Sequence, residues 1–345
     1  MPVAISICVT SLFWRALMTN KMKILIAYDG SACADAALDD LQQAGLPAEA
    51  EAVVMSVTEM WLPAPPPSSF EVVALARAVH VPSDLTRVYS ENSPAVKAAQ
   101  ALADRAATRL RSNFPKWEVT TQVAVGSPKS ELIHQADIWK PDLIVLGSHG
   151  HSALARLVLG SVSQGVLAEA HCSVRIARGR VEEPRTPVRI VIGVDGSDAS
   201  TAAVREVASR HWPPGSEVRV IAVTDPLSPG FFGSLIPQIR DFVIESNQEE
   251  WEWLKQLLHS SYEEFKDSQL RVSTEIKEGD PRTDLAKAAA VWNADCIFVG
   301  SIGFGNRLER FVLGSVSATV AARAHCSVEV VRLPKTAVGN GHGTL

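Results

Sequence analysis

Short apolar runs alternate with longer segments of helical periodicity along most of the chain. In the first half, the strand-like runs cover residues 24–28, 52–57, 119–125, 143–146 and 173–177. They are apolar throughout rather than alternating apolar with polar, which is typical of strands covered on both faces. The helical patterns between them cover residues 32–43, 94–111, 130–139 and 161–170. Five strands with interposed helices predict a doubly wound parallel α/β sheet with right-handed crossovers.

Three sequence blocks occur twice in the same order, which indicates a tandem duplication. The longest pair is VLGSVSQGVLAEAHCSVRIAR at 158–178 and VLGSVSATVAARAHCSVEVVR at 312–332, with 14 identities in 21 positions. The other two pairs are KILIAYDGS (23–31) with RIVIGVDGS (189–197), and DLIVLGSHG (142–150) with DCIFVGSIG (295–303). We therefore expect two copies of one five-stranded domain. In the second copy, a long amphipathic helix over 238–265 is expected to place Trp251, Trp253 and Leu254 in a core or an interface.

The repeat sets the expected domain boundaries. We predict one domain over 22–179, a polar linker with two prolines over 180–187, and a second domain over 188–334. Residues 1–21 are expected to be an extension, with Met18 and Met22 as alternative starts, and 335–345 a disordered tail. The first copy is 12 residues longer between shared blocks, and the proline-rich run at 61–67 is the expected place for this excess.

Composition narrows the classes of function. The 345 residues carry 33 basic and 38 acidic side chains, for a formal charge of -5. This balance argues against a broad basic surface for nucleic acid, although it leaves room for a local phosphate site. No apolar run approaches the roughly 20 residues that span a bilayer. The five cysteines are scattered without a C-x-x-C pair, which favours free thiols in a reducing cytoplasm over a disulfide framework.

An Asp-Gly-Ser sequence follows the first predicted strand of each copy, at 29–31 and at 195–197. In a parallel sheet, ligands bind beyond the carboxyl ends of the strands. Asp29 and Asp195 could accept a hydrogen bond from a ribose hydroxyl there, or cap the next helix. On these residues alone, capping is the favoured interpretation.

A glycine-rich loop follows the fourth predicted strand. It reads Gly147-Ser-His-Gly150, then nine residues, then Gly160-Ser-Val-Ser163 at the start of a helix. The free N–H groups, the hydroxyls and the positive end of the helix dipole suit a phosphate. An ordinary glycine turn with a Ser N-cap is the alternative. The spacing matches neither the Walker P-loop nor the Rossmann fingerprint, and His149 with His151 is too small a set for a metal site.

Together, the Asp-Gly-Ser turn and the pattern G-x2-G-x9-G-S resemble the universal stress protein (UspA) family, over about residues 22–335. The resemblance implies an adenine-nucleotide alpha-hydrolase-like sheet in the order 3-2-1-4-5. It also implies ATP, alone or with Mg²⁺, across strands 1 and 4. The last strands, 173–177 and 327–331, would pair within the chain as a pseudo-dimer, and a further homodimer is an open alternative. The implied nucleotide site of the first copy comprises Asp29, Val57, Gly147, His149, Gly150, Gly160, Ser161, Val162 and Ser163.

The second copy departs from this pattern, because ten residues rather than nine separate Gly303 from Gly314, and Ile302 replaces His149. Nucleotide binding is therefore favoured in the first copy. The corresponding residues of the second copy are Asp195, Val223, Gly300, Gly303, Gly314, Ser315, Val316 and Ser317.

The leading functional hypothesis is a cytoplasmic stress-response or regulatory protein that binds an adenine nucleotide and is not an enzyme. One alternative is an interaction module without nucleotide. The other is a slow ATPase, or a protein that phosphorylates itself on Ser161 or Ser163. No nucleic-acid or membrane partner is expected.

Overall fold

A computed structural model describes residues 21–58, 93–150, 159–178, 186–225, 237–301 and 313–333. Several predicted features lie outside the described residues. They are the expected C-terminal tail, the proline-rich run, Gly303, most of the expected linker, and all but the last residue of the expected extension.

The described part of the first copy contains five strands and four α-helices in alternation. They are β1 Met22–Ala27, α2 Ala32–Asp40, β2 Ala50–Thr58, α5 Pro94–Asn113, β3 Glu118–Val125, α6 Pro128–Trp139, β4 Leu143–Gly147, α7 Ser161–Glu169 and β5 Ser173–Ala177. The second copy repeats the series with β6 Arg189–Val194, α8 Asp198–Ser209, β7 Glu217–Thr224, α10 Pro237–Glu263, β8 Arg271–Glu278, α11 Pro281–Val291, β9 Cys296–Gly300, α12 Ser315–Arg323 and β10 Ser327–Val331.

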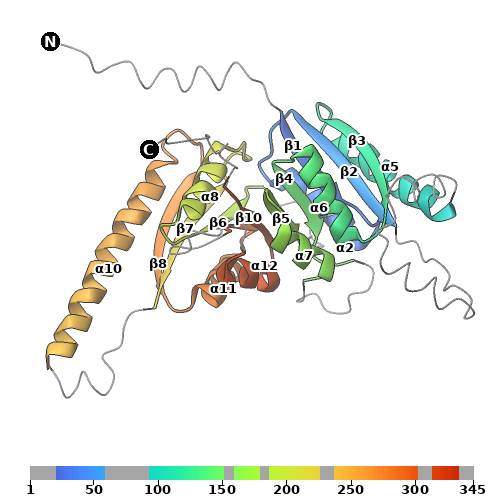
Figure 1. Cartoon of the computed structure of the whole chain (residues 1–345). Helices are drawn as coiled ribbons and strands as arrows, with labels where there is room; N and C mark the ends of the chain where they lie inside the picture. Colours follow the sequence, from blue (N-terminus) through green and yellow to red (C-terminus); the bar gives the residue numbers. More distant parts are fainter. Residues whose placement is uncertain are drawn as a thin grey trace, which may run out of the picture.

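The ten strands form one continuous sheet in the order β3-β2-β1-β4-β5-β10-β9-β6-β7-β8. Each copy therefore has the order 3-2-1-4-5, and the predicted doubly wound α/β class is confirmed. All neighbours are parallel except β5 and β10, which join the copies in antiparallel fashion. Figure 1 shows the first copy, in blue to green, beside the second, in yellow to red, with β5 and β10 between them.

Helices cover both faces of this sheet. On one face, side chains of α6, α7, α11 and α12 form a single apolar cluster that runs across both copies. On the other face, α2 and α5 cover the first copy and α8 and α10 cover the second, each pair with a cluster of its own. The strands are apolar throughout because both of their faces are buried; Ile24, Leu25 and Ile26 of β1, for example, are fully inaccessible.

Local sequence explains where the helices begin and end. Pro94 and Pro281 occupy first-turn positions after Ser93 and Asp280, whose side chains accept hydrogen bonds from the helix amides. The helix expected over 32–43 is α-helical only to Asp40, and a 3₁₀ turn, η1 (Leu41–Gln43), completes it. Such tightening of the last turn satisfies carbonyl groups that an α-helix leaves unpaired at its end.

The two copies exchange reciprocal contacts at the β5–β10 junction. The backbone N–H of Arg178, just after β5, donates to Ser327 Oγ at 3.0 Å, and that of Arg332, just after β10, donates to Ser173 Oγ at 3.2 Å. The Arg178 guanidinium also donates to carbonyls in the last turn of α12, including Ala321 O at 2.7 Å. Arg332 does the same to Leu167 O of α7 at 2.7 Å. Each copy thus caps a helix of the other with a buried arginine.

Candidate functional site

The first strand of each copy ends in the predicted Asp-Gly-Ser turn. Asp29 Oδ1 accepts a hydrogen bond from the backbone N–H of Ser31 at 2.9 Å, and Gly30 adopts a φ of 79° that favours glycine. The helix cap is Ser31, whose Oγ accepts from Ala34 N at 3.2 Å. The favoured interpretation that Asp29 caps the helix is therefore wrong, because the carboxylate holds the turn that precedes the cap.

All nine residues predicted for the first copy line one cavity of about 200 Å³. The cavity lies where β1, β2 and β4 end and α7 begins. The nine residues are Asp29, Val57, Gly147, His149, Gly150, Gly160, Ser161, Val162 and Ser163.

Apolar side chains form much of the remaining lining, and sequence reasoning missed these positions. Met55 of β2, Leu132 of α6 and Leu146 of β4 are each at most 3% exposed, and Pro128 and Tyr28 complete the wall. Met55 lies two residues before Val57 and so on the same face of its strand, which is a signal the sequence offered. For Pro128 and Leu132 no comparable signal exists, because their place depends on how α6 packs on the sheet.

The hydroxyl of Tyr28 is fixed at the edge of this wall. It donates to Asp35 Oδ1 at 2.6 Å and accepts from Arg105 Nη2 at 2.6 Å. Burial and the hydrogen bond to Asp35 raise the pKa of Tyr28, partly offset by Arg105. The phenol therefore stays protonated, and the side chain packs with α2 and α5 on the other face of the sheet from Leu132.

Close packing at Gly147 ties the glycine loop to the rest of the sheet. A Cβ at Gly147 would lie 2.8 Å from the carbonyl carbon of Cys33, so no other residue fits without moving the backbone. Ser163 Oγ donates to Gly147 O at 2.8 Å and is buried. The hydroxyl of Ser163 thus fastens α7 to the end of β4, although the residue also lines the cavity.

The N-terminus of α7 faces the cavity without a side-chain cap from the described residues. Its N-cap is Gly160, in extended conformation, whereas Ser31, Ser93, Ser197 and Asp280 cap their helices with side-chain oxygens. The first-turn N–H groups and the helix dipole at such an end attract an anion.

His149 adds a second polar group to this end of the cavity. It is 8% exposed, and its Nδ1 lies 2.9 Å from Ser148 Oγ. Its Nε2 is buried and has no hydrogen-bond partner among the described residues. Burial and the positive charge of Arg178 lower the pKa of His149, so the ring is neutral near pH 7. An unpartnered buried ring nitrogen is a group that a ligand could satisfy.

The second copy places Asp195, Val223, Gly300, Gly314, Ser315, Val316 and Ser317 at equivalent positions of the fold, with Gly303 outside the described residues. One packing difference bears on this site. A Cβ at Gly193, where the first copy has Ala27, would lie 2.8 Å from Leu285 Cδ1. The Asp-Gly-Ser turn is closely covered in both copies, because a Cβ at Gly196 would lie 2.6 Å from the ring of Trp253 of α10 and one at Gly30 would lie 2.7 Å from Leu102 Cδ2. Trp253 was expected in a core or interface, but it is 42% exposed and lies against the Asp-Gly-Ser turn.

Among the described residues, no group of three or more His, Cys, Asp or Glu side chains is placed to hold a metal ion. None of the helices described combines the length and apolar character needed to cross a membrane.

The sequence of this chain matches a known family twice. The model of the Universal stress protein family matches residues 21–178 and again residues 188–332, and the chain belongs to this family. Universal stress protein MJ0531 of Methanocaldococcus jannaschii is 34% identical over 147 residues, which are 43% of this chain and 83% of that protein. Universal stress protein Mb2028c of Mycobacterium bovis is 25% identical over 328 residues, 90% of this chain and 96% of that protein.

A solved structure shows the same fold over most of the chain. The crystal structure of a universal stress protein from Archaeoglobus fulgidus DSM 4304 covers 91% of this chain and 97% of its own, with a TM-score of 0.56 and 19% sequence identity. The predicted family and its tandem form are therefore confirmed.

Proposed function

We propose that this protein binds ATP or a related adenine nucleotide in the cavity of the first copy. The observation that carries the proposal is the convergence, in one cavity, of an apolar wall, the Asp29 carboxylate and the uncapped start of α7. An apolar pocket with a few convergent polar groups is the usual form of a small-molecule site. The wall suits a flat base, Asp29 suits ribose hydroxyls, and the α7 amides suit phosphate oxygens.

The second copy supports binding less well. Leu285 packs so close to Gly193 that the Cβ carried by the corresponding Ala27 of the first copy would lie 2.8 Å from it. We therefore propose one nucleotide per chain.

Binding without turnover is the activity we propose. Among the lining residues that the structure describes, Asp29 is the single carboxylate. Phosphoryl transfer relies on metal ions held by protein oxygens and on an oriented nucleophile. The nucleotide would then act as a regulatory ligand that favours one conformation or partner contact, and the cytoplasmic stress role remains a prediction.

Isothermal titration calorimetry with ATP, ADP and AMP tests the proposal. We expect binding of one nucleotide per chain, and Asp29→Asn should weaken it by about tenfold or more, since hydrogen bonds to charged groups contribute about 1.5–3 kcal/mol. The exposed Asp198→Asn serves as the control for loss of one carboxylate. Absence of heat and of a thermal shift at millimolar nucleotide would overturn nucleotide binding, and phosphate release that depends on Asp29 would overturn binding without turnover.

A further inference from the structure

The strands that join the two copies carry opposite charges at their centre. Arg175 of β5 and Glu329 of β10 occupy the same position of the repeat, SVRIA against SVEVV. They are also direct partners in the antiparallel register. Their side chains are 1% and 0% exposed, and Arg175 Nη1 lies 3.2 Å from Glu329 Oε2. Because equivalent strands pair here, this position lies at the pseudo-twofold axis between the copies.

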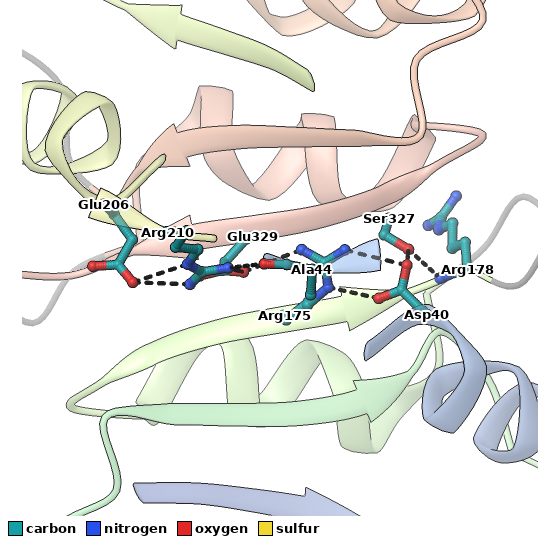
Figure 2. Close-up of polar contacts among 8 residues, drawn as sticks. All are labelled: Asp40, Ala44, Arg175, Arg178, Glu206, Arg210, Ser327 and Glu329. Atoms are coloured by element: carbon teal, nitrogen blue, oxygen red, sulfur yellow. Dashed lines mark hydrogen bonds and ion pairs between the residues drawn. The ribbon is translucent and has the colours of Figure 1, made fainter. Parts of the chain in front are cut away.

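Each charge is also held within its own copy (Figure 2). Asp40, at the end of α2, accepts from Arg175 Nε at 2.6 Å and from Nη2 at 3.2 Å. On the other side, Arg210 follows α8 and binds Glu329, with Nη1 at 3.0 Å from Oε2, and also binds Glu206. The cluster of Asp40, Arg175, Glu329 and Arg210 thus alternates in sign across the junction.

The copies differ in a way that fits this alternation. Asp40 and Glu206 correspond in the repeat, 11 residues after Asp29 and Asp195. Four residues later the first copy has Ala44 and the second has Arg210. In the first copy the acid Asp40 is enough to neutralise Arg175. In the second copy Glu329 is itself an acid, so a further cation, Arg210, is needed between Glu329 and Glu206. Arg210 Nη1 also donates across the junction to Ala44 O at 2.9 Å, where the small side chain leaves room.

An aromatic ring adds to the distinction between the copies. Phe298 of β9 lies 6.0 Å from the Arg175 guanidinium and 5.1 Å from that of Arg210, within the range of cation–π attraction. The first copy has Val145 at the corresponding position. Both guanidinium groups therefore lie near a ring that the second copy supplies and the first copy lacks at this position.

We propose that the Arg175–Glu329 pair makes the junction selective for unlike copies. If the first copies of two chains paired through β5, Arg175 would face Arg175 on the buried axis. If the second copies of two chains paired through β10, Glu329 would face Glu329 there. Asp40 and Arg210 would still hold these charges within each copy, but like charges directly opposite on paired strands destabilise the pairing. The partner that fits the β5 edge is thus the β10 edge of a second copy, and the chain closes on itself instead of assembling through like halves.

The test compares three full-length proteins with a protease site placed within residues 179–185: the wild type, Arg175→Gln/Glu329→Gln, and Arg109→Gln as a control. Arg109 pairs with Asp35 and Asp39 inside the first copy, away from the junction. Each protein is cut in the folded state, diluted and followed by native mass spectrometry, which separates the two halves by mass. We expect unlike pairs alone from the wild type and the control, and like pairs approaching a random mixture from the double variant. Like pairs in the wild type, or none in the double variant, would overturn the proposal.

A second measurement on the uncut chain covers the case in which the cut protein does not stay folded. The urea midpoints of Arg175→Gln, Glu329→Gln and the double variant form a double-mutant cycle. We expect non-additivity equivalent to about a tenfold change in the unfolding equilibrium, since contacting buried charges couple strongly. Additive effects would overturn the proposal.

Discussion

Three glycines of the cavity meet different neighbours, so the same change to alanine should have three different results. A Cβ at Gly147 would lie 2.8 Å from the carbonyl carbon and oxygen of Cys33, which are backbone atoms of α2. At Gly150 it would lie 2.8 Å from Asp29 Oδ2, the end of a side chain. At Gly160 the nearest atom, His149 Cα, would be 3.4 Å away, an ordinary contact.

Gly147→Ala should reduce stability. Neither β4 nor α2 can move by a few tenths of an ångström without disturbing buried neighbours, because interiors are close-packed. Inserting a methyl group into such a place typically lowers the free energy of unfolding by about 1–3 kcal/mol. Urea denaturation should therefore show a clearly lower midpoint for Gly147→Ala than for the wild type.

Gly150→Ala should instead reduce binding. The Asp29 carboxylate can rotate away from the new methyl group at the expense of its hydrogen bond from Ser31 N, so the free energy of unfolding should fall by about 1 kcal/mol, less than in Gly147→Ala. The rotation removes Oδ2 from its place in the cavity. If Asp29 binds the ribose, nucleotide affinity should fall by about tenfold or more, as for Asp29→Asn.

Urea denaturation and calorimetry with ATP measure the two effects separately, and Gly160→Ala is the control that should fold like the wild type. Wild-type affinity in Gly150→Ala together with lost affinity in Asp29→Asn would refute the argument from displacement. A wild-type urea midpoint in Gly147→Ala would refute the argument from close packing.

Three side chains of the first copy, His149, Ser163 and Arg178, make contacts whose loss can be measured. The lowered pKa of His149 means that the unfolded chain binds the proton more tightly, so the stability this residue contributes is complete above about pH 6.5 and declines as the pH falls through the folded-state pKa. His149→Gln should flatten the decline of the urea midpoint between about pH 7 and 5, and an unchanged slope would contradict the assignment. Ser163→Ala should lower the free energy of unfolding by about 1 kcal/mol, because the hydrogen bond to Gly147 O is lost. Ser161 is exposed, so Ser161→Ala should change the free energy of unfolding by less than half as much. Equal effects of the two variants in urea denaturation would count against this role of Ser163. Arg178→Met should cost about 1–2 kcal/mol in the same assay because the α12 carbonyls lose their donors, and an unchanged midpoint would show that water replaces the guanidinium there.

Much of the fold was predictable because the strands are continuous apolar runs of a doubly covered sheet. The strand expected over 173–177 matches β5, and that over 143–146 differs from β4 by one residue. Helix ends were less accurate, as in the 3₁₀ turn after Asp40, since they depend on which carbonyl groups the surroundings satisfy.

The polar residues of the cavity were predicted, whereas its apolar wall was predicted only in part, at Val57 and Val162. Asp29 lies just after β1 and Gly147 is the last residue of β4, so sheet topology alone brings them to one edge. Leu132 reaches the same cavity from α6, and its position depends on the packing of that helix against β2 and β4. Periodicity shows that such a residue is buried, but not which neighbours it meets.

Duplication is weaker support for a ligand site than the sequence suggests. Several doubled residues perform the same structural task in both copies: Ser163 Oγ donates to Gly147 O, and Ser317 Oγ donates to Gly300 O at 2.7 Å. A residue retained for packing is repeated just as faithfully as one retained for binding.

The positions at which the copies differ are more informative. Within the longest repeated block, Arg175 and Glu329 are among the few mismatches, and they meet on the axis between the copies. The first copy has Ala27 where the second has Gly193 with Leu285 packed against it, and this difference distinguishes the two candidate sites in the same way. Each difference is a single change in the sequence, but its effect depends on contact with a residue of another helix or strand. For a duplicated chain, the repeat therefore predicts the architecture, while assigning different roles to the two halves requires the mismatches to be placed in three dimensions.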